Sequence, residues 1–345
     1  MLVRSHNEWD PLEEVVVGTA RTARVPRDGP DVRAIDYPDV PADEPLPCGP
    51  LPEVVRGEAE DDLDDLAEVL ASLGVRVRRP APAEAPAPFS NGWWTTDGYH
   101  AACPRDSVLV VGDRLIEAPM VLRSRQFEVQ ALRPLLLEYE AAGARWISAP
   151  RPLLADDLYD LDAAPGARLR DHEPVFDAAN VVRLGRDLLY LVSDSGNGRG
   201  AAWLERALDG EYRVHRCAGI YARTHVDSTI VPIRPGLVLL NPERVNDANM
   251  PEYLEKWDKL WCPPLVDIGY AGDRPACSIW IGMNLLMVRP DLALVDDRQL
   301  ELARHLERAG VGVQPCRLRH ARTIGGGLHC CTLDIRRGGE LEDYG

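Results

Sequence analysis

A cysteine in a glycine-rich segment is the first candidate for chemistry. Residues 325–334 read GGGLHCCTLD, so three glycines precede Cys330, and a strand-like run over Thr332–Ile335 follows it. Glycines let the backbone pass close to another group or adopt a positive φ. A cysteine at such a junction can be exposed enough to act as a nucleophile, whereas the competing interpretation is a buried cysteine beside a turn. The segment lacks the GK[ST] ending of a phosphate-binding P-loop.

A histidine and an aspartate form the second candidate group. His225 and Asp227 lie two residues apart, and in an extended segment their side chains point to the same face. Histidine exchanges protons near neutral pH, and a neighbouring carboxylate can share that work or hold a cation. A polar pair on a surface strand is the alternative.

Two further carboxylates, Asp106 and Asp177, each precede a predicted β-hairpin, as His225 and Asp227 do. Carboxylates that cap backbone N–H groups in turns are the alternative explanation. Zinc could be held by residues 329–331 with His225, but adjacent ligands suit a tetrahedral site poorly, and CxxC and HxxxH spacings are absent. The sequence therefore predicts no metal site.

The elements that position these residues form a weak repeat. Each unit has a β-hairpin, an amphipathic helix and a returning strand. The expected hairpins are 108–118, 181–192, 229–240 and 285–295, and residues 13–19 supply part of a fifth unit. The expected helices are 58–73, 134–142, 201–208, 251–259 and 298–309, followed by strands at 75–78, 145–147, 212–215, 265–268 and 311–314.

Five such ββαβ units favour a closed radial arrangement, because closure protects the strand edges. An open α/β sheet with insertions is the alternative. In a radial arrangement the hairpin entrances converge at one end, so Asp106, Asp177, His225 and Asp227 would meet there with Cys330 nearby.

Composition excludes several classes of protein. The 345 residues carry a formal net charge of −16, which argues against nucleic-acid and anionic-membrane partners. Acidic residues interrupt the first 20 positions, and no apolar run is long enough to span a bilayer. Eight scattered cysteines without a CxxC pair indicate reduced thiols in the cytoplasm. We expect one domain over 1–345, with a loop insertion around 26–52 and a second surface loop at 80–88.

Taken together, these segments resemble the amidinotransferases of the pentein superfamily. The likeness covers nearly the whole chain in order and is carried by residues 6–14, 104–106, 176–179, 225–227, 241–244, 283–284, 325–334 and 336–337. Residues 192–197 and 221–229 are most similar to the inosamine-phosphate type of these enzymes.

The resemblance implies a five-bladed α/β propeller and ping-pong transfer of an amidino group from L-arginine, without a metal or organic cofactor. Matched position by position, Cys330 would be the nucleophile, His225 the proton shuttle and Asp177 its partner. Asp106 and Asp227 would hold the guanidinium, while Arg244 and Ser278 would hold the α-carboxylate of the donor. The chemistry is sound, because a thiolate can attack a guanidinium carbon that two carboxylates hold in place.

The acceptor implied by the resemblance is scyllo-inosamine 4-phosphate, and L-ornithine is the leaving product. Glycine or another small amine, a deiminase-type arginine hydrolase and a non-catalytic binding protein are the alternatives; the retained set of five polar residues argues against the last. Arg24 and Arg223 are candidate phosphate anchors, and solvated surface side chains are the competing interpretation of both. The oligomeric state, including a homodimer, stays open.

Two positions depart from the usual family pattern. Cys331 follows the expected nucleophile directly, and we expect its side chain to face away from the substrate because neighbouring strand positions alternate. Leu328 stands where a phenylalanine is usual.

Overall fold

Five three-stranded sheets form the framework of the protein in this computed structural model, which describes residues 2–81, 88–97 and 100–345. In each sheet the first two strands are antiparallel and the third runs parallel to the second. Four sheets follow the chain order: β7 (Val108–Val111), β8 (Arg114–Glu117) and β9 (Arg145–Ser148); β10 (Val181–Leu184), β11 (Asp187–Leu191) and β12 (Arg213–Cys217); β13 (Ile230–Arg234), β14 (Leu237–Leu240) and β15 (Asp258–Trp261); β16 (Leu286–Arg289), β17 (Leu292–Asp296) and β18 (Gly312–Cys316).

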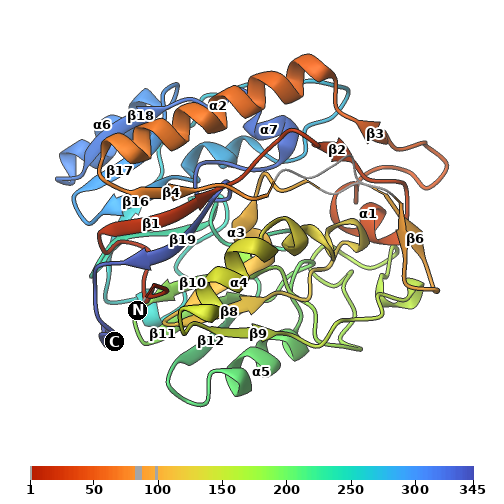
Figure 1. Ribbon diagram of the computed structural model, residues 1–345, viewed down its shortest axis with the longest axis horizontal. Coiled ribbons are helices and arrows are strands. Elements are labelled where there is room, and N and C mark those ends of the chain that lie inside the picture. Colours follow the sequence, from red (N-terminus) through yellow and green to blue (C-terminus); the bar gives the residue numbers. More distant parts are fainter. Residues whose placement is uncertain (1, 82–87, 98–99) are drawn as a thin grey trace.

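The fifth sheet joins the two ends of the chain. It contains β19 (Thr332–Arg337), β1 (Leu12–Val17) and β4 (Arg76–Arg78), with Val16 opposite Leu333. In Figure 1 the red β1 and the blue β19 accordingly lie side by side.

Helices connect the second and third strands of four sheets: α2 (Glu53–Ser72), α4 (Arg133–Ala141), α5 (Gly198–Ala207) and α6 (Leu300–Arg308). In α2, Leu63, Leu66 and Leu70 recur at helical spacing and are all buried. At the start of α5, the side chain of Asn197 caps the helix by accepting from the Gly200 N–H. In the described part of the chain, no helix is long and apolar enough to cross a membrane.

Hydrophobic clusters link the sheets into a ring. One cluster contains Val16 and Val110, and a second contains Leu109 and Val181. A third runs through the β10, β13 and β16 sheets, and a fourth joins Leu286 of β16 to Val15 of β1. Each sheet therefore packs against two others, and the fold is the expected five-bladed α/β propeller.

The expected elements of the β13 sheet are partly wrong. The structure has no helix over 251–259 and no strand over 265–268; a 3₁₀ turn at Glu252–Leu254 leads directly into β15. Trp257 is buried against Trp9, with ring centroids 5.8 Å apart. The backbone of Val266 pairs with the side-chain amide of Gln299 instead of with a strand.

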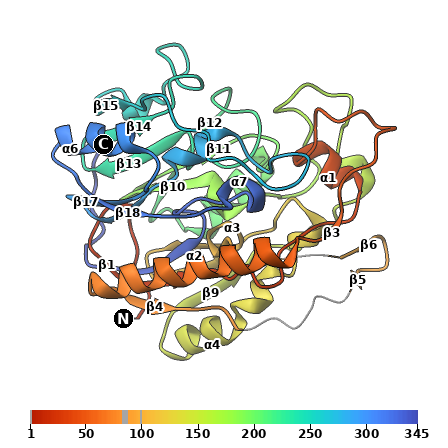
Figure 2. The same ribbon diagram turned by 90° about the horizontal axis from the view of Figure 1, so that it is seen from above.

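The segment 26–52 is not a surface loop throughout. It contains α1 (Pro30–Ile35), in which Val32 and Ile35 are buried, and β3 (Gly49–Pro50), which pairs with β2 (Arg24–Val25). Figures 1 and 2 place α1 and β3 on the side of the molecule away from both chain termini. A second small hairpin, β5 (Phe89–Ser90) and β6 (Thr95–Thr96), lies on the same side. Of the predicted loop 80–88, residues 82–87 lie outside the described residues.

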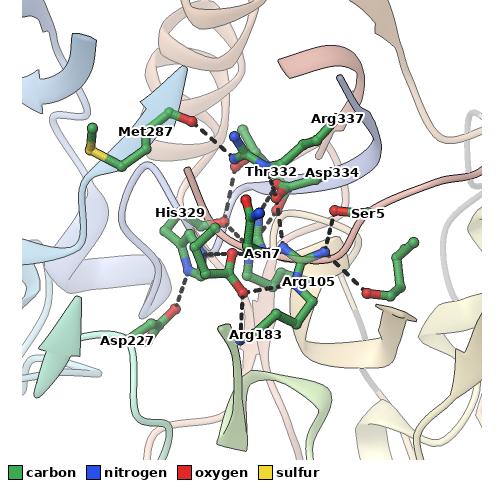
Figure 3. A network of polar contacts seen from close by, with 12 residues as sticks. Ser5, Asn7, Arg105, Arg183, Asp227, Met287, His329, Thr332, Asp334 and Arg337 are labelled. Atoms are coloured by element: carbon green, nitrogen blue, oxygen red, sulfur yellow. Dashed lines mark hydrogen bonds and ion pairs between the residues drawn. The ribbon is translucent and has the colours of Figure 1, made fainter. Parts of the chain in front are cut away.

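A buried ion network occupies the centre of the ring (Figure 3). Arg183 of β10 donates to Glu8 at 2.6 and 2.8 Å and to Asp334 of β19 at 2.7 Å. Arg105 also bonds to Asp334, and it donates to the carbonyls of His329 and Thr332 at 2.8 and 2.9 Å.

The network reaches the remaining sheets through Arg337 and His329. Arg337 donates to Asp334 at 2.7 Å and to the Met287 carbonyl of β16 at 2.9 Å. His329 lies 3.3 Å from Glu8 and 2.9 Å from Asp227, which precedes β13. Burial would raise the pKa of Glu8, but Arg183, His329 and Arg105 hold it well below its usual range. One set of ion pairs thus ties all five sheets together.

Replacing Glu8 by alanine should destabilise the fold by about 3–5 kcal/mol, because the buried guanidinium of Arg183 loses one of its two paired carboxylates. Urea unfolding followed by circular dichroism measures this loss. The matched control is Glu340→Ala, since Glu340 pairs with Arg4 on the surface with its side chain 79% exposed; its unfolding midpoint should not move. Equal midpoints for the two variants would refute the central role of the network.

Candidate active site

The five segments that lead into the first strand of each sheet meet at one end of the ring. Asp106 lies in α3 (Pro104–Ser107), directly before β7, and Asp177 precedes β10. His225 and Asp227 precede β13, Asn284 precedes β16, and Cys330 precedes β19. The structure therefore brings together five of the seven site residues expected from the sequence: Cys330, His225, Asp177, Asp106 and Asp227.

His225 lies between two carboxylates. Its Nε2 is 3.1 Å from Oδ2 of Asp177, and its Nδ1 is 3.7 Å from Oδ1 of Asp106. Burial alone would lower the pKa of His225, but Asp106, Asp177 and Asp227 raise it to about 9. The imidazole is therefore protonated near neutral pH and can donate a proton.

The backbone conformation at His225 differs from the extended segment considered in the sequence analysis. Its φ is +63°, in the left-handed region, so Thr224–Asp227 is not extended. A non-glycine residue in this region costs about 1 kcal/mol or more. The Ser195 hydroxyl accepts from the His225 N–H at 3.3 Å, and the turn still delivers both His225 and Asp227 to the site.

Cys330 is buried beside Asp227. Its thiol donates to Oδ2 of Asp227 at 3.3 Å, and its sulfur lies within 4.8 Å of polar atoms of both Asp106 and His225. Burial, reinforced by the negative charges of Asp227 and Asp106, raises the pKa of the Cys330 thiol well above its usual range. The thiol is therefore neutral near pH 7, and a bound cation would favour the thiolate.

Asp227 is held in its ionised form. Nδ1 of His329 lies 2.9 Å from its Oδ2, and Asn284 donates to its backbone carbonyl at 3.3 Å. Burial would raise the pKa of Asp227, but His329 and His225 keep it far below its usual range. A fixed negative charge therefore lies next to the sulfur.

Asp106 offers a free oxygen to the site. Its Oδ2 accepts from Arg125 at 2.9 Å, whereas its buried Oδ1 has no hydrogen-bond partner among the described residues. Burial raises the pKa of Asp106, and His225 and Arg125 oppose that rise. A buried oxygen with unused acceptor capacity is a binding position for an N–H donor.

Arg244 and Ser278 contact each other beside this cluster. Arg244 Nη2 donates to Oγ of Ser278 at 3.1 Å, and its guanidinium lies 3.6 Å from the ring centroid of Tyr221. Nη1 of Arg244 donates to Oγ1 of Thr229 at 2.8 Å. These contacts fix a planar guanidinium that can bind a carboxylate.

A cavity of about 300 Å³ opens onto the cluster. Its wall contains Asp106, Asp177 and His225 together with Cys277, the neighbour of Ser278. Asp36, at the end of α1, also borders it, and burial raises the pKa of that carboxyl to about 7 despite the opposing charge of Arg125. The volume suits a small molecule.

The three glycines bring the cysteine close to its neighbours. Gly325, with φ of +85°, ends α7 (Ala321–Ile324). A Cβ on Gly326 would collide with the sulfur of Cys103, and one on Gly327 would lie 2.6 Å from Oδ1 of Asn284. That oxygen accepts from the backbone N–H groups of His329 and Cys330 at 3.0 and 3.1 Å. Side chains in this segment would therefore displace the cysteine.

Cys331 faces away from the cluster, as expected. Its side chain borders a small pocket with Ala59 and Leu63 of α2. Neither Cys330 nor Cys331 is among the described residues that border the site cavity, so the contacts of Cys330 with Asp227, Asp106 and His225 distinguish the two thiols.

The types of side chain in the site would also accept a metal ion. Polar atoms of Asp106, His225 and Cys330 lie within 4.8 Å of one another. A metal would have to displace protons from an imidazole whose pKa is about 9 and from a thiol whose pKa is raised. The donor set therefore fits proton transfer better than metal binding at neutral pH.

Sequence reasoning missed the residues that act through others. The sequence assigns no role to three residues of the site. Arg125 donates to Asp106, and Asn284 accepts from the backbone N–H of Cys330. Asp36 borders the cavity. The order Met283-Asn284 before a hairpin was a usable signal, since the other hairpin entrances also carry polar site residues. No sequence signal marks Arg125.

Comparison with known proteins gives close relatives. The chain is 58% identical over 99% of both chains to inosamine-phosphate amidinotransferase 1 of Streptomyces glaucescens. It is 37% identical to the L-arginine:L-lysine amidinotransferase of Pseudomonas savastanoi pv. phaseolicola, over 99% of this chain and 96% of that one. The solved inosamine-phosphate amidinotransferase of Streptomyces griseus superposes with a TM-score of 0.98 at 58% identity, covering 99% of each chain.

A more distant likeness shows the fold alone. DDAH from Pseudomonas aeruginosa superposes with a TM-score of 0.60 at 12% identity, over 94% of this chain and 99% of that one. No protein-family model matches the chain.

Replacing Asp177 by asparagine should lower the pKa of His225 from about 9, because the imidazolium loses a negative partner 3.1 Å away. NMR titration of the labelled imidazoles measures the pKa, and His225→Gln assigns the resonance. Asp39→Asn is the control, since Asp39 is exposed and pairs with Arg223. An unchanged pKa in the Asp177 variant would contradict the assigned ion pair.

Replacing Gly327 by alanine should cost about 1–3 kcal/mol of folding free energy, because the new Cβ forces Asn284 to move. Gly57→Ala is the control: Gly57 lies inside α2 with nothing within 4 Å of its Cβ position, so that variant should gain about 0.5–1 kcal/mol. Urea unfolding compares the two, and a stabilised Gly327 variant would rule out the close approach.

Proposed function

The chain belongs to the amidinotransferase family, and from this premise we propose that it transfers the amidino group of L-arginine to scyllo-inosamine 4-phosphate. The transfer passes through a covalent amidino group on Cys330 and releases L-ornithine. The observation that carries the proposal is the buried cluster in which Cys330, His225 and Asp106 approach within 4.8 Å of one another. The nearly full-length relatives named for inosamine phosphate favour that acceptor.

The charges of the site support a guanidinium as the donor group. Asp106, Asp177 and Asp227 lie around His225. Arg125 pairs with Asp106 and His329 with Asp227, yet within the described residues Oδ1 of Asp106 still has an unused acceptor position. A planar cation can donate to the free Oδ1 of Asp106 and to Asp227, which places its central carbon near the sulfur. Arg244 and Ser278 bind the α-carboxylate of the same donor in this proposal.

The first half-reaction begins when the bound guanidinium lowers the pKa of the Cys330 thiol. A C–S bond forms at the guanidinium carbon, and the C–N bond to ornithine then breaks. The departing amine takes up the thiol proton and one proton from His225, so ornithine leaves as an ammonium and the imidazole becomes neutral. Asp177 holds the ring in position through Nε2. Amidino-cysteine and ornithine are the products.

The second half-reaction runs in the opposite direction. The amine of the acceptor attacks the amidino carbon, His225 takes one proton from it, and the C–S bond breaks. His225 keeps this proton, and the thiolate of Cys330 takes up the proton that the acceptor ammonium lost when its amine became free, so the enzyme returns to its starting form. The covalent intermediate divides one difficult substitution into two easier steps.

Replacing Cys330 by alanine should abolish both ornithine formation and transfer, because no other described thiol meets Asp227 and His225. Intact-protein mass spectrometry after addition of L-arginine alone should show one amidino group on the wild type and none on the variant. Equal release of ornithine from wild type and variant would refute the nucleophile.

Cys331→Ala is the matched control for this test. Cys331 is the neighbouring buried thiol and faces α2, so the variant should still form the adduct and complete the transfer. Addition of scyllo-inosamine 4-phosphate should then remove the adduct and yield its guanidino product. Steady release of citrulline without an acceptor would instead identify a hydrolase.

A further inference from the structure

Three arginines line the site cavity, and they differ in how fully their donors are used. Arg125 donates to Asp106 once and to Glu128 twice, at 2.7–2.9 Å, so it is committed to the wall. Arg274 is 40% exposed and pairs with Glu44. The side chain of Arg24 in β2 is only 16% exposed. Arg24 is therefore not the solvated surface residue that the sequence analysis gave as the competing interpretation.

Arg24 has a donor to spare. Its Nη2 bonds to Oδ2 of Asp97 at 3.0 Å, but its buried Nε has no hydrogen-bond partner among the residues that the structure describes. Buried guanidinium donors are normally satisfied, and an unused one in a cavity wall indicates a missing acceptor.

The charge around Arg24 also lacks a partner. Asp97 is shared between Arg24 and Arg27, whose Nε lies 3.5 Å from Oδ1 of the same carboxylate. Two guanidinium groups thus face one carboxylate, so the immediate surroundings of Arg24 are positive, although Asp36, Asp106 and Asp177 also border the cavity. An anionic ligand would balance this charge.

Around Cys330 the neighbouring carboxylates are negatively charged. There Asp106, Asp177 and Asp227 would repel an anion, so a substrate with an amine and an anionic group must place its anion elsewhere. Arg24 and Asp106 border the same cavity. Arg24 lies on the antiparallel pair β2–β3, on the side of the molecule that also holds α1 (Figure 1).

We infer that Arg24 binds the phosphate group of the acceptor, a phosphorylated aminocyclitol, and thereby selects it over acceptors without a phosphate. This inference rests on the proposed function. A guanidinium matches the planar, two-point geometry of phosphate recognition, and the spare Nε supplies one of the two donors. Arg223, the other candidate from the sequence, pairs with Asp39, is 39% exposed and does not border the cavity.

The test separates the two half-reactions. Amidino-enzyme is prepared with L-arginine and desalted, and its decay is followed with scyllo-inosamine 4-phosphate or with scyllo-inosamine. In Arg24→Gln, kcat/KM for the phosphorylated acceptor should fall about 10- to 100-fold, the usual effect of losing a charged hydrogen bond. The rate with scyllo-inosamine and the ornithine burst should stay near wild type. Arg24→Lys should recover part of the loss.

Arg223→Gln is the matched control and should keep the wild-type preference for the phosphorylated acceptor. An Arg24→Gln enzyme with an undiminished preference would overturn the inference.

If the wild-type enzyme used neither aminocyclitol, the proposed acceptor would be refuted. A second measurement tests anion binding by Arg24 independently of the acceptor. Inorganic phosphate should inhibit amidino transfer to hydroxylamine in the wild type and not in Arg24→Gln. Equal inhibition of both enzymes would overturn the assignment of the anion site.

Discussion

The buried ion network at the centre of the ring is the interaction on which the rest of the structure depends. Glu8 and Asp334 pair there with three guanidinium groups, and the partners come from segments far apart in the sequence. Desolvating these charges is costly unless every one is paired, so the network forms only when the sheets are correctly arranged. Specificity of assembly, rather than added stability, is the physical reason to place ions where apolar side chains would also pack.

The same network continues into the catalytic cluster. His329 lies between Glu8 and Asp227, next to Cys330 in the chain, so the charge at the centre of the ring is coupled to the carboxylate beside the sulfur. Asp227 stays ionised because of this contact, whereas Asp106 and Cys330 are shifted by burial towards their neutral forms. The buried carboxylates therefore favour a cation, and in the proposed reaction a bound guanidinium would also lower the pKa of the thiol.

Much of this arrangement is predictable from short-range patterns. Turn residues between β-branched runs predict the hairpins, and the recurring polar residue before each hairpin predicts that Asp106, Asp177, His225 and Asp227 converge with Cys330 nearby. The β13 sheet was mispredicted because proline and polar residues in 241–259 imitate a helix start, while burial of Trp257 against Trp9 decides the outcome. Asn284 and the positive φ of His225 depend on partners from other sheets, and Arg125 depends on Asp106, 19 residues earlier in its own unit; local patterns contain neither kind of contact.

The pairing of β19 with β1 has a consequence for biosynthesis. Ribosomes make the chain from its N-terminus, so β1 emerges early and has an open edge until the last residues are released. Cys330 lies two positions before the strand that fills this edge, and Asp334 within that strand supplies the central carboxylate. A chain interrupted before this point lacks both Cys330 and β19, the strand that completes the fifth sheet. The same short segment thus supplies the site cysteine and the strand that joins the two ends of the chain.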